Sequence, residues 1–200
     1  EGRPGSLVRQ PGYVAMITLS GGWDQGFAIH HYNRPEGGRT LLGEAIYRYQ
    51  YRKQWYLVDA LARWAQSFLN TTPSLSQPDL LVPVPSTGFS VDYDPTHLLV
   101  DWLSQLTGVP RAVGVLTRHG LISEYGDGSQ EAGRGSLQVT APDAVRGRRV
   151  LLVDGIICSG ATLNLATQAL RQAEASEVLV LVFTRIERQS SDAFGGRRSL

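Results

Sequence analysis

An aspartate and two hydroxyl side chains lie close together in the segment 150–170. Asp154 ends an apolar run, and Ser159 and Thr162 open the amphipathic stretch that follows it. Backbone N–H groups at the start of a helix are unpaired and attract a phosphate, and small residues let the phosphate approach them. A carboxylate just upstream can accept hydrogen bonds from sugar hydroxyls, directly or through a hydrated divalent cation. The segment therefore predicts a site for a phosphorylated sugar or a nucleotide.

Each of these residues also has an ordinary structural explanation. Asp154 can merely end a strand, and Ser159 or Thr162 can merely cap a helix. The ordered set of an apolar strand, an acid, a short turn and small residues on a helix favours phosphate binding over these separate explanations. Neither of the glycine-rich nucleotide motifs, G-x-G-x-x-G and G-x-x-x-x-G-K-[ST], occurs in the chain.

The elements that must position these residues are indicated by the alternation of short apolar runs with amphipathic stretches. We expect crossover helices over Pro95–Leu106, capped by Asp94, and over Ala161–Ala173. This alternation predicts an α/β fold with a central parallel sheet flanked by helices. The expected strands of that sheet are Leu80–Val84, Ala112–Leu116, Val150–Val153 and Val178–Phe183.

Upstream of the predicted sheet, Tyr13–Ser20 and Phe27–Tyr32 indicate a β-hairpin that stands apart from the rest of the chain. The spacing of apolar residues predicts a helical face over Leu42–Leu69, with Thr71-Thr72-Pro73 ending the helix. Glycine-rich Thr117–Gly135 is too long for an ordinary connection and indicates a lid. The expected organisation is a hairpin or hood region at residues 1–40, an α/β domain at 41–188 and a flexible tail at 189–200.

The composition limits the partners of the protein. With 19 basic and 18 acidic side chains, the chain lacks a global electrostatic footprint for nucleic acid or an anionic membrane. The single cysteine, Cys158, makes neither an internal disulfide nor a cysteine-rich zinc site, and no apolar run has the length of a membrane span. We therefore expect a cytoplasmic protein without a membrane partner or a metal site built by protein side chains alone.

The aromatic and basic segment Tyr47–Tyr56 is a candidate for binding nucleic acid, because bases can stack on aromatic rings between basic groups. At helical spacing, however, some of these aromatic residues face the core and the charged residues face solvent. We expect no nucleic acid partner from this segment.

The segment Arg148–Leu163 resembles the 5-phosphoribosyl-1-pyrophosphate (PRPP) binding signature of type I phosphoribosyltransferases. Among them it is most similar to the competence-associated, ComF-like group. The similarity extends through Ser136–Val139 and Leu80–Ser86, and more loosely through Leu42–Leu69. It implies displacement of pyrophosphate from PRPP by a nitrogenous acceptor, with Mg²⁺ neutralising the pyrophosphate.

The resemblance also implies a role for individual residues. Asp154 contacts the ribose hydroxyls. Thr117–Gly135 is the loop that closes over PRPP, with Arg118 and Arg134 as candidate charge partners. The candidate catalytic residues are Asp154, Arg118 and Arg134. The residues implied to bind the pyrophosphate are Pro85, Ser86 and Thr87. The residues implied to bind PRPP are Asp154, Gly155, Ile156, Ile157, Cys158, Ser159, Gly160, Ala161 and Thr162.

The chain departs from the family pattern at several positions. The signature carries two adjacent acids where this chain has Asp154 and Gly155, and Gln50 stands near the position of a family lysine. With one cysteine, the sequence predicts no zinc module like that of the group, and the stretch after Pro85 has no family arginine. Two functions therefore stay open: a PRPP-dependent transferase, and a non-catalytic PRPP-binding or nucleotide-binding domain with a regulatory or DNA-uptake role. The acceptor is not identified by the sequence, and a homodimer is left open.

Overall fold

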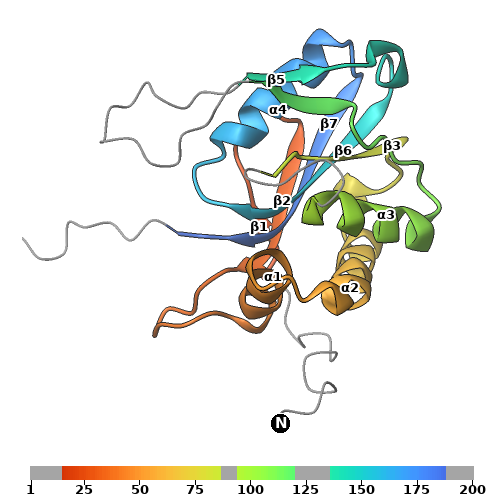
Figure 1. Cartoon of the computed structure of the whole chain (residues 1–200). Coiled ribbons are helices and arrows are strands. Elements are labelled where there is room, and N and C mark those ends of the chain that lie inside the picture. The colour runs from red at the N-terminus through yellow and green to blue at the C-terminus, as the bar shows by residue number, and fades with distance from the viewer. Residues whose placement is uncertain (1–14, 87–93, 120–135, 188–200) are drawn as a thin grey trace, which may run out of the picture.

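The computed structural model describes residues 15–86, 94–119 and 136–187. Five strands form the central sheet in the order β1-β2-β7-β6-β3, and every neighbouring pair is parallel except the antiparallel pair of β1 with β2. The sheet runs through the middle of the molecule (Figure 1). Its strands are β1 (Ile17–Thr18), β2 (Gln25–His31), β3 (Leu80–Pro83), β6 (Arg149–Ile157) and β7 (Glu177–Arg185).

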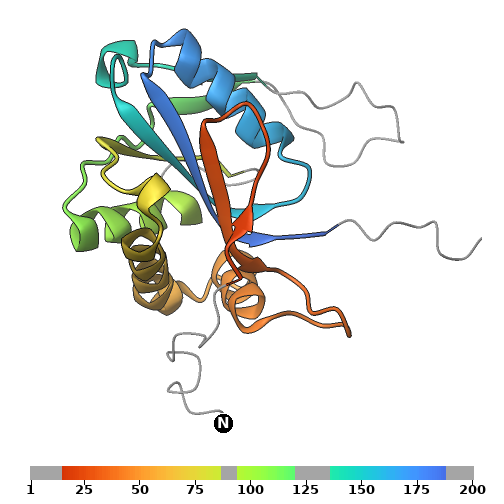
Figure 2. The ribbon, with the colours of Figure 1, turned by 180° about the vertical axis from the view of Figure 1, so that it is seen from behind.

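Helices cover both faces of this sheet (Figures 1 and 2). On one face pack α1 (Leu41–Tyr51), α2 (Val58–Thr71) and α3 (Pro95–Thr107). On the other face pack α4 (Ala161–Gln172) and a two-stranded antiparallel sheet of β4 (Leu116–His119) and β5 (Ser136–Val139). Short 3₁₀ turns occupy Trp55–Leu57, Pro73–Leu75 and Pro142–Ala144.

The alternation of side chains along β6 explains why this strand lies at the centre. Leu151 and Val153 belong to the core cluster beneath α1, α2 and α3, whereas Val150 and Leu152 belong to the cluster beneath α4, and all four are 0% exposed. A strand that is buried on both faces needs a continuous apolar run, and parallel sheets covered by helices supply that environment. The structure confirms the predicted fold class.

The helical segment expected over Leu42–Leu69 is two helices, not one. Helix α1 begins after Thr40, whose Oγ1 accepts from the Gly43 N–H at 3.0 Å. It ends at Tyr51, and Lys53 then adopts a positive φ of 54°, which an α-helix does not allow. The apolar spacing continues into α2, so the sequence pattern did not show the break.

The amino-terminal hairpin is part of the central sheet and does not stand apart. Strand β1 pairs antiparallel with β2 at Ile17–Thr18, and β2 is a parallel neighbour of β7 from Gln25 to His31. Phe27 and Ile29 enter the core cluster beneath α1. The hairpin belongs to the sheet because its inward side chains cover core residues that β7 alone would leave exposed to solvent.

The expected strand Ala112–Leu116 is also corrected. The chain forms a single parallel bridge to β3 at Arg111, turns at Gly114 with a φ of 78°, and enters β4 at Leu116. Strand β4 pairs antiparallel with β5 outside the central sheet. The apolar residues Val115 and Leu116 are buried, but beneath the other face of the molecule.

Parts of three predicted segments lie outside the described residues. The lid expected over Thr117–Gly135 is described only to His119, and the tail 189–200 and the start of the expected strand Tyr13–Ser20 are not described. Within the part of the chain that the structure covers, no helix has the length and apolarity needed to cross a membrane.

Candidate functional site

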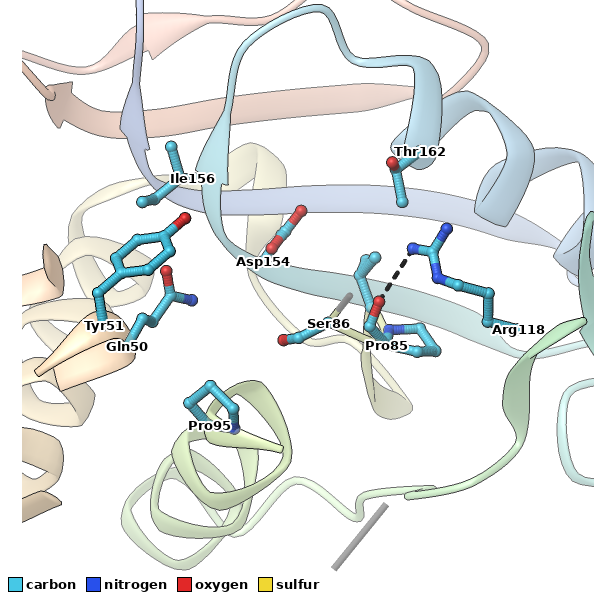
Figure 3. A pocket seen from close by; sticks show the side chains of 10 residues that line it. Gln50, Tyr51, Pro85, Ser86, Pro95, Arg118, Asp154, Ile156 and Thr162 are labelled. Carbon is cyan, nitrogen blue, oxygen red and sulfur yellow. Dashed lines mark hydrogen bonds between the residues drawn. The ribbon is translucent and has the colours of Figure 1, made fainter. Parts of the chain in front are cut away.

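A cavity opens where β3 and β6 separate. The last backbone hydrogen bond between them runs from the Val84 N–H to the Val153 carbonyl at 2.9 Å, whereas β6 stays paired with β7 as far as Ile157. Asp154 is the first residue of β6 beyond this divergence, and ligands of open parallel sheets collect at such carboxyl ends. The cavity has a volume of about 270 Å³ and is lined by Gln50, Tyr51, Val84, Pro85, Ser86, Pro95, Arg118, Asp154, Ile156 and Thr162 (Figure 3).

Asp154 does not end its strand as the sequence predicted, because it pairs with Val182 of β7 inside a longer β6. Its half-buried side chain points into the cavity (Figure 3). Burial, assisted by the negative charge of Asp94, raises the pKa of Asp154 to about 7, against the opposing effects of the Gly155 and Ile156 N–H groups and of Arg118. The Gly155 N–H donates to Asp154 Oδ1 at 2.7 Å. The carboxylate thus changes charge near neutral pH.

The start of α4 forms a second hollow next to the first. Gly160 precedes the helix with a φ of 76°, and Ser159 Oγ accepts from the Ala161 N–H at 3.3 Å. This hollow has a volume of about 190 Å³ and is lined by Asp154 and by residues 156–163. Asp154, Ile156 and Thr162 line both hollows. The Asp154 carboxylate and the start of α4 therefore border one continuous space. Its two ends have the groups that bind a sugar and a phosphate.

The turn after β3 is held by a buried aspartate. Asp94 accepts from the Ser86 N–H at 2.7 Å, from Ser86 Oγ at 2.8 Å and from the Thr96 N–H at 2.8 Å. The same carboxylate therefore caps α3, as the sequence predicted, and fixes the floor of the cavity. Pro85 and Ser86 line the cavity. Thr87 lies outside the described residues.

Arg118 enters the cavity from β4 (Figure 3). Its Nη2 donates to the Pro85 carbonyl at 3.0 Å, and its buried Nε has no hydrogen-bond partner among the residues that the structure describes. Burial lowers the pKa of Arg118, and the charges of Asp154 and Asp94 oppose that effect. The site thus holds a cationic group beside Pro85 and Ser86. Arg134, the second arginine expected at this site, lies outside the described residues.

Sequence reasoning did not place five residues at this site. Gln50, Tyr51, Val84 and Pro95 line the cavity, and Asp94 was expected only as a helix cap. The signal for Gln50 was present, since both Gln50 and Gly155 depart from the family pattern. A Cβ built on Gly155 would lie 2.1 Å from Gln50 Nε2, so the two departures meet in space.

The aromatic segment of α1 divides between the core and the surface, as the sequence indicated. Tyr49 is 0% exposed and its hydroxyl donates to the Pro95 carbonyl at 2.7 Å. Tyr51 and Tyr56 are 61% and 66% exposed. The Arg39 guanidinium lies 3.5 Å from the ring centroid of Tyr47, which places a cation over one of the surface rings.

Three comparisons place the chain among known proteins. The phosphoribosyl transferase domain family matches residues 50–194. Competence protein F of Haemophilus influenzae is 28% identical over 171 residues, which are 79% of this chain and 71% of that protein. This similarity confirms the expected resemblance to the competence-associated group.

Solved structures show weaker similarity. Glutamine PRPP amidotransferase from B. subtilis, complexed with ADP and GMP, is 22% identical with a TM-score of 0.42 over 76% of this chain, which spans only 29% of that enzyme. Hypoxanthine-guanine phosphoribosyl transferase of L. donovani is 20% identical with a TM-score of 0.43, over 66% of this chain and 81% of that one.

The family match covers more than half of the chain and includes β3, β6, α4 and β7. These elements supply Ser86, Asp154 and the helix start that line the two joined hollows. The chain belongs to the phosphoribosyl transferase domain family.

Proposed function

We propose that the protein binds PRPP in the joined hollows and transfers its ribose 5-phosphate group to a nitrogenous acceptor, with release of pyrophosphate. The observation that carries this proposal is the shared lining of the two hollows by Asp154 and Thr162, since the carboxylate and the helix start then face one ligand. In this arrangement residues 158–162 hold the 5-phosphate and Asp154 accepts from the ribose hydroxyls.

Arg118 fits the pyrophosphate end of PRPP. It offers its Nε–H, unpartnered among the described residues, together with its positive charge. Ser86, whose hydroxyl donates to Asp94, holds the turn that lines this end of the cavity. In the transfer, a bond forms between the acceptor nitrogen and the anomeric carbon, and the bond from that carbon to the pyrophosphate oxygen breaks. The pyrophosphate leaves with the bonding electron pair, and Arg118 stabilises the negative charge on that oxygen.

Mg²⁺ enters this proposal as a companion of PRPP. The described residues hold no group of three or more histidine, cysteine, aspartate or glutamate side chains that could bind a metal ion. Among the residues placed by the structure, Asp154 is the one carboxylate in the lining of the cavity. A single carboxylate fits Mg²⁺, which keeps several waters and takes its other ligands from substrate phosphates. When bound, Mg²⁺ would neutralise the charge on the pyrophosphate.

We further propose the segment after β2 as a hood over the acceptor. A separate hollow of about 320 Å³ is lined by His31, Asn33, Arg34, Pro35, Arg185 and Glu187. It lies at the carboxyl ends of β2 and β7, and β7 pairs with the end of β6 at Ile157. The position supports a role beside the ribose site, in line with the expected hood at residues 1–40.

The lack of a second acid at position 155 favours a second candidate function. Asp154 is followed by no second acid, and the Gln50 amide occupies the space into which a side chain at position 155 would project. A single carboxylate binds the ribose less tightly than two would, because each charge-assisted hydrogen bond contributes roughly 1.5 to 3 kcal/mol to the binding free energy. The alternative is a domain that binds PRPP or a nucleotide without efficient transfer.

Calorimetric titration of PRPP with and without Mg²⁺, on the unmutated protein and on Asp154→Asn, tests the binding step. We expect binding that Asp154→Asn weakens strongly. No binding by the unmutated protein at millimolar PRPP would refute the proposal. A pyrophosphate-release assay with a panel of nitrogenous bases then separates the two functions, because binding without release supports the regulatory domain.

A further inference from the structure

The Gln50 side chain is a buried polar group that points at the candidate site. It lies in the last turn of α1, is 9% exposed, and faces the same cavity as Asp154 (Figure 3). Within the described parts of the chain its carboxamide makes no hydrogen bond, and its nitrogen and oxygen are not among the fully buried unpaired atoms, so they face the open cavity. The two N–H donors and the oxygen of this amide therefore face a ligand that enters the cavity.

The backbone of β6 makes room for this amide. A Cβ on Gly155 would lie 2.1 Å from Gln50 Nε2, 2.8 Å from Cδ and 3.0 Å from Oε1. Glycine at this position therefore lets the carboxamide lie against the strand, in the lining of the cavity that Asp154 also lines. Any side chain at position 155 would displace the amide from the cavity wall.

We propose that the Gln50 carboxamide binds the ring hydroxyls of the ligand together with Asp154, and that this pair selects ribose over 2-deoxyribose. The inference rests on the proposed binding of a ribose 5-phosphate group. Each sugar hydroxyl is both a donor and an acceptor, so one hydroxyl can donate to the Asp154 carboxylate while the diol accepts from Gln50 Nε2–H. Removal of one hydroxyl from the ligand leaves a buried polar group unpaired, and this loss produces the selectivity.

The pair Asp154 and Gln50 carries one negative charge at most. A site with one carboxylate and one neutral amide needs less countercharge than a site with two carboxylates. We therefore expect ribose 5-phosphate itself, without a divalent cation, to bind and to show the selectivity.

The test measures the affinity of ribose 5-phosphate, 2-deoxyribose 5-phosphate and inorganic phosphate by calorimetry without added metal. The variants are Gln50→Leu, which removes the amide at similar volume, and Gln50→Glu, which keeps the shape and removes the donor. Gln105→Leu, on an exposed position of α3 outside the cavity lining, is the matched control.

We expect the unmutated protein to prefer ribose 5-phosphate over its 2-deoxy analogue by about 10- to 100-fold, the range of one buried hydrogen bond. Gln50→Leu and Gln50→Glu should reduce this ratio and weaken ribose 5-phosphate binding, with inorganic phosphate binding unchanged. Gln105→Leu should change neither quantity. A structural role alone would alter the thermal unfolding temperature and leave the ratio intact.

Gly155→Ala gives an independent arm. The three atoms nearest to the added methyl group all belong to the far end of the flexible Gln50 side chain, so we expect the amide to move and the fold to persist. We expect Gly155→Ala to reduce the ratio as Gln50→Leu does, and the double variant to show no further loss, because both changes remove one interaction.

Two results would overturn the inference in different ways. If the unmutated protein binds ribose 5-phosphate and Gln50→Leu keeps both the affinity and the ratio, the role of Gln50 is wrong and the proposed function stands. If the unmutated protein binds neither sugar phosphate at millimolar concentration, the proposed function and the inference fail together.

Discussion

Asp154→Asn tests whether the charge of Asp154 lowers the free energy of unfolding. The carboxyl of Asp154 has a pKa of about 7 in the folded protein, against an ordinary value of 3.8. Between these values the folded state holds a proton that the unfolded state has released, so the free energy of unfolding falls as pH rises. The full stability is present below pH 3.8 and is lost as pH rises to about 7. An asparagine carries no such proton, and its stability is free of this pH dependence.

The size of the effect depends on the titration range. Each pKa unit corresponds to about 1.4 kcal/mol, so the two units from pH 5 to pH 7 give an upper value of roughly 3 kcal/mol. Asp154 is partly open to the cavity, and solvent reduces the penalty on its charge. We expect Asp154→Asn to gain about 1 to 3 kcal/mol of stability relative to the unmutated protein between pH 5 and pH 8.

Urea unfolding at pH 5 and pH 8, without ligand, measures this difference. Asp59→Asn, which removes an exposed carboxylate paired with Arg63 on α2, controls for the change in net charge. If Asp154→Asn differs from the unmutated protein by the same amount at both pH values, the carboxyl is not held in a charge-disfavouring environment and the reasoning is refuted.

The same site supports three further predictions. Ribose 5-phosphate should bind more tightly as pH rises through about 7, because the ionised Asp154 accepts a hydrogen bond from the ribose diol. A calorimetric pH series checks this, and Asp154→Asn should reduce the pH dependence. Gly160→Ala and Gly114→Ala should each lower the free energy of unfolding by roughly 1 to 2 kcal/mol, because both positions have a φ near 75°. Only Gly160→Ala should weaken phosphate binding, and equal affinity in the two variants would show that the start of α4 does not bind the phosphate. Ribose 5-phosphate should slow the alkylation of the exposed Cys158 by iodoacetamide, a rate that mass spectrometry measures. An unchanged rate would show that the phosphate binds elsewhere.

The local elements of the site could be predicted from the sequence because their signals are short-range. The apolar run of β6, the small residues before α4 and the Asp94 cap of α3 each depend on neighbours along the chain. The α/β fold class could be predicted from the alternation of these elements. The family assignment required the ordered motif, which is also a local pattern.

The errors arose where contacts distant in the sequence decide the outcome. Asp154 was expected at the end of its strand, but pairing with β7 extends β6 to Ile157. The run Ala112–Leu116 has the composition of a strand of the main sheet, yet the turn at Gly114 sends it to pair with β5. Apolar residues show that a segment is buried, but not beneath which face.

The sequence by itself determined the strand, turn and helix that form a phosphate cradle, and the absence of a second acid at Gly155. The tertiary structure alone decided what occupies that gap. Helix α1 brings Gln50 Nε2 to within 2.1 Å of where a Cβ at position 155 would lie, although the two residues are 105 positions apart in the chain. No local pattern specifies that contact, because it depends on how α1 packs across the carboxyl end of the sheet, which is set by the shared core beneath α1, α2 and α3.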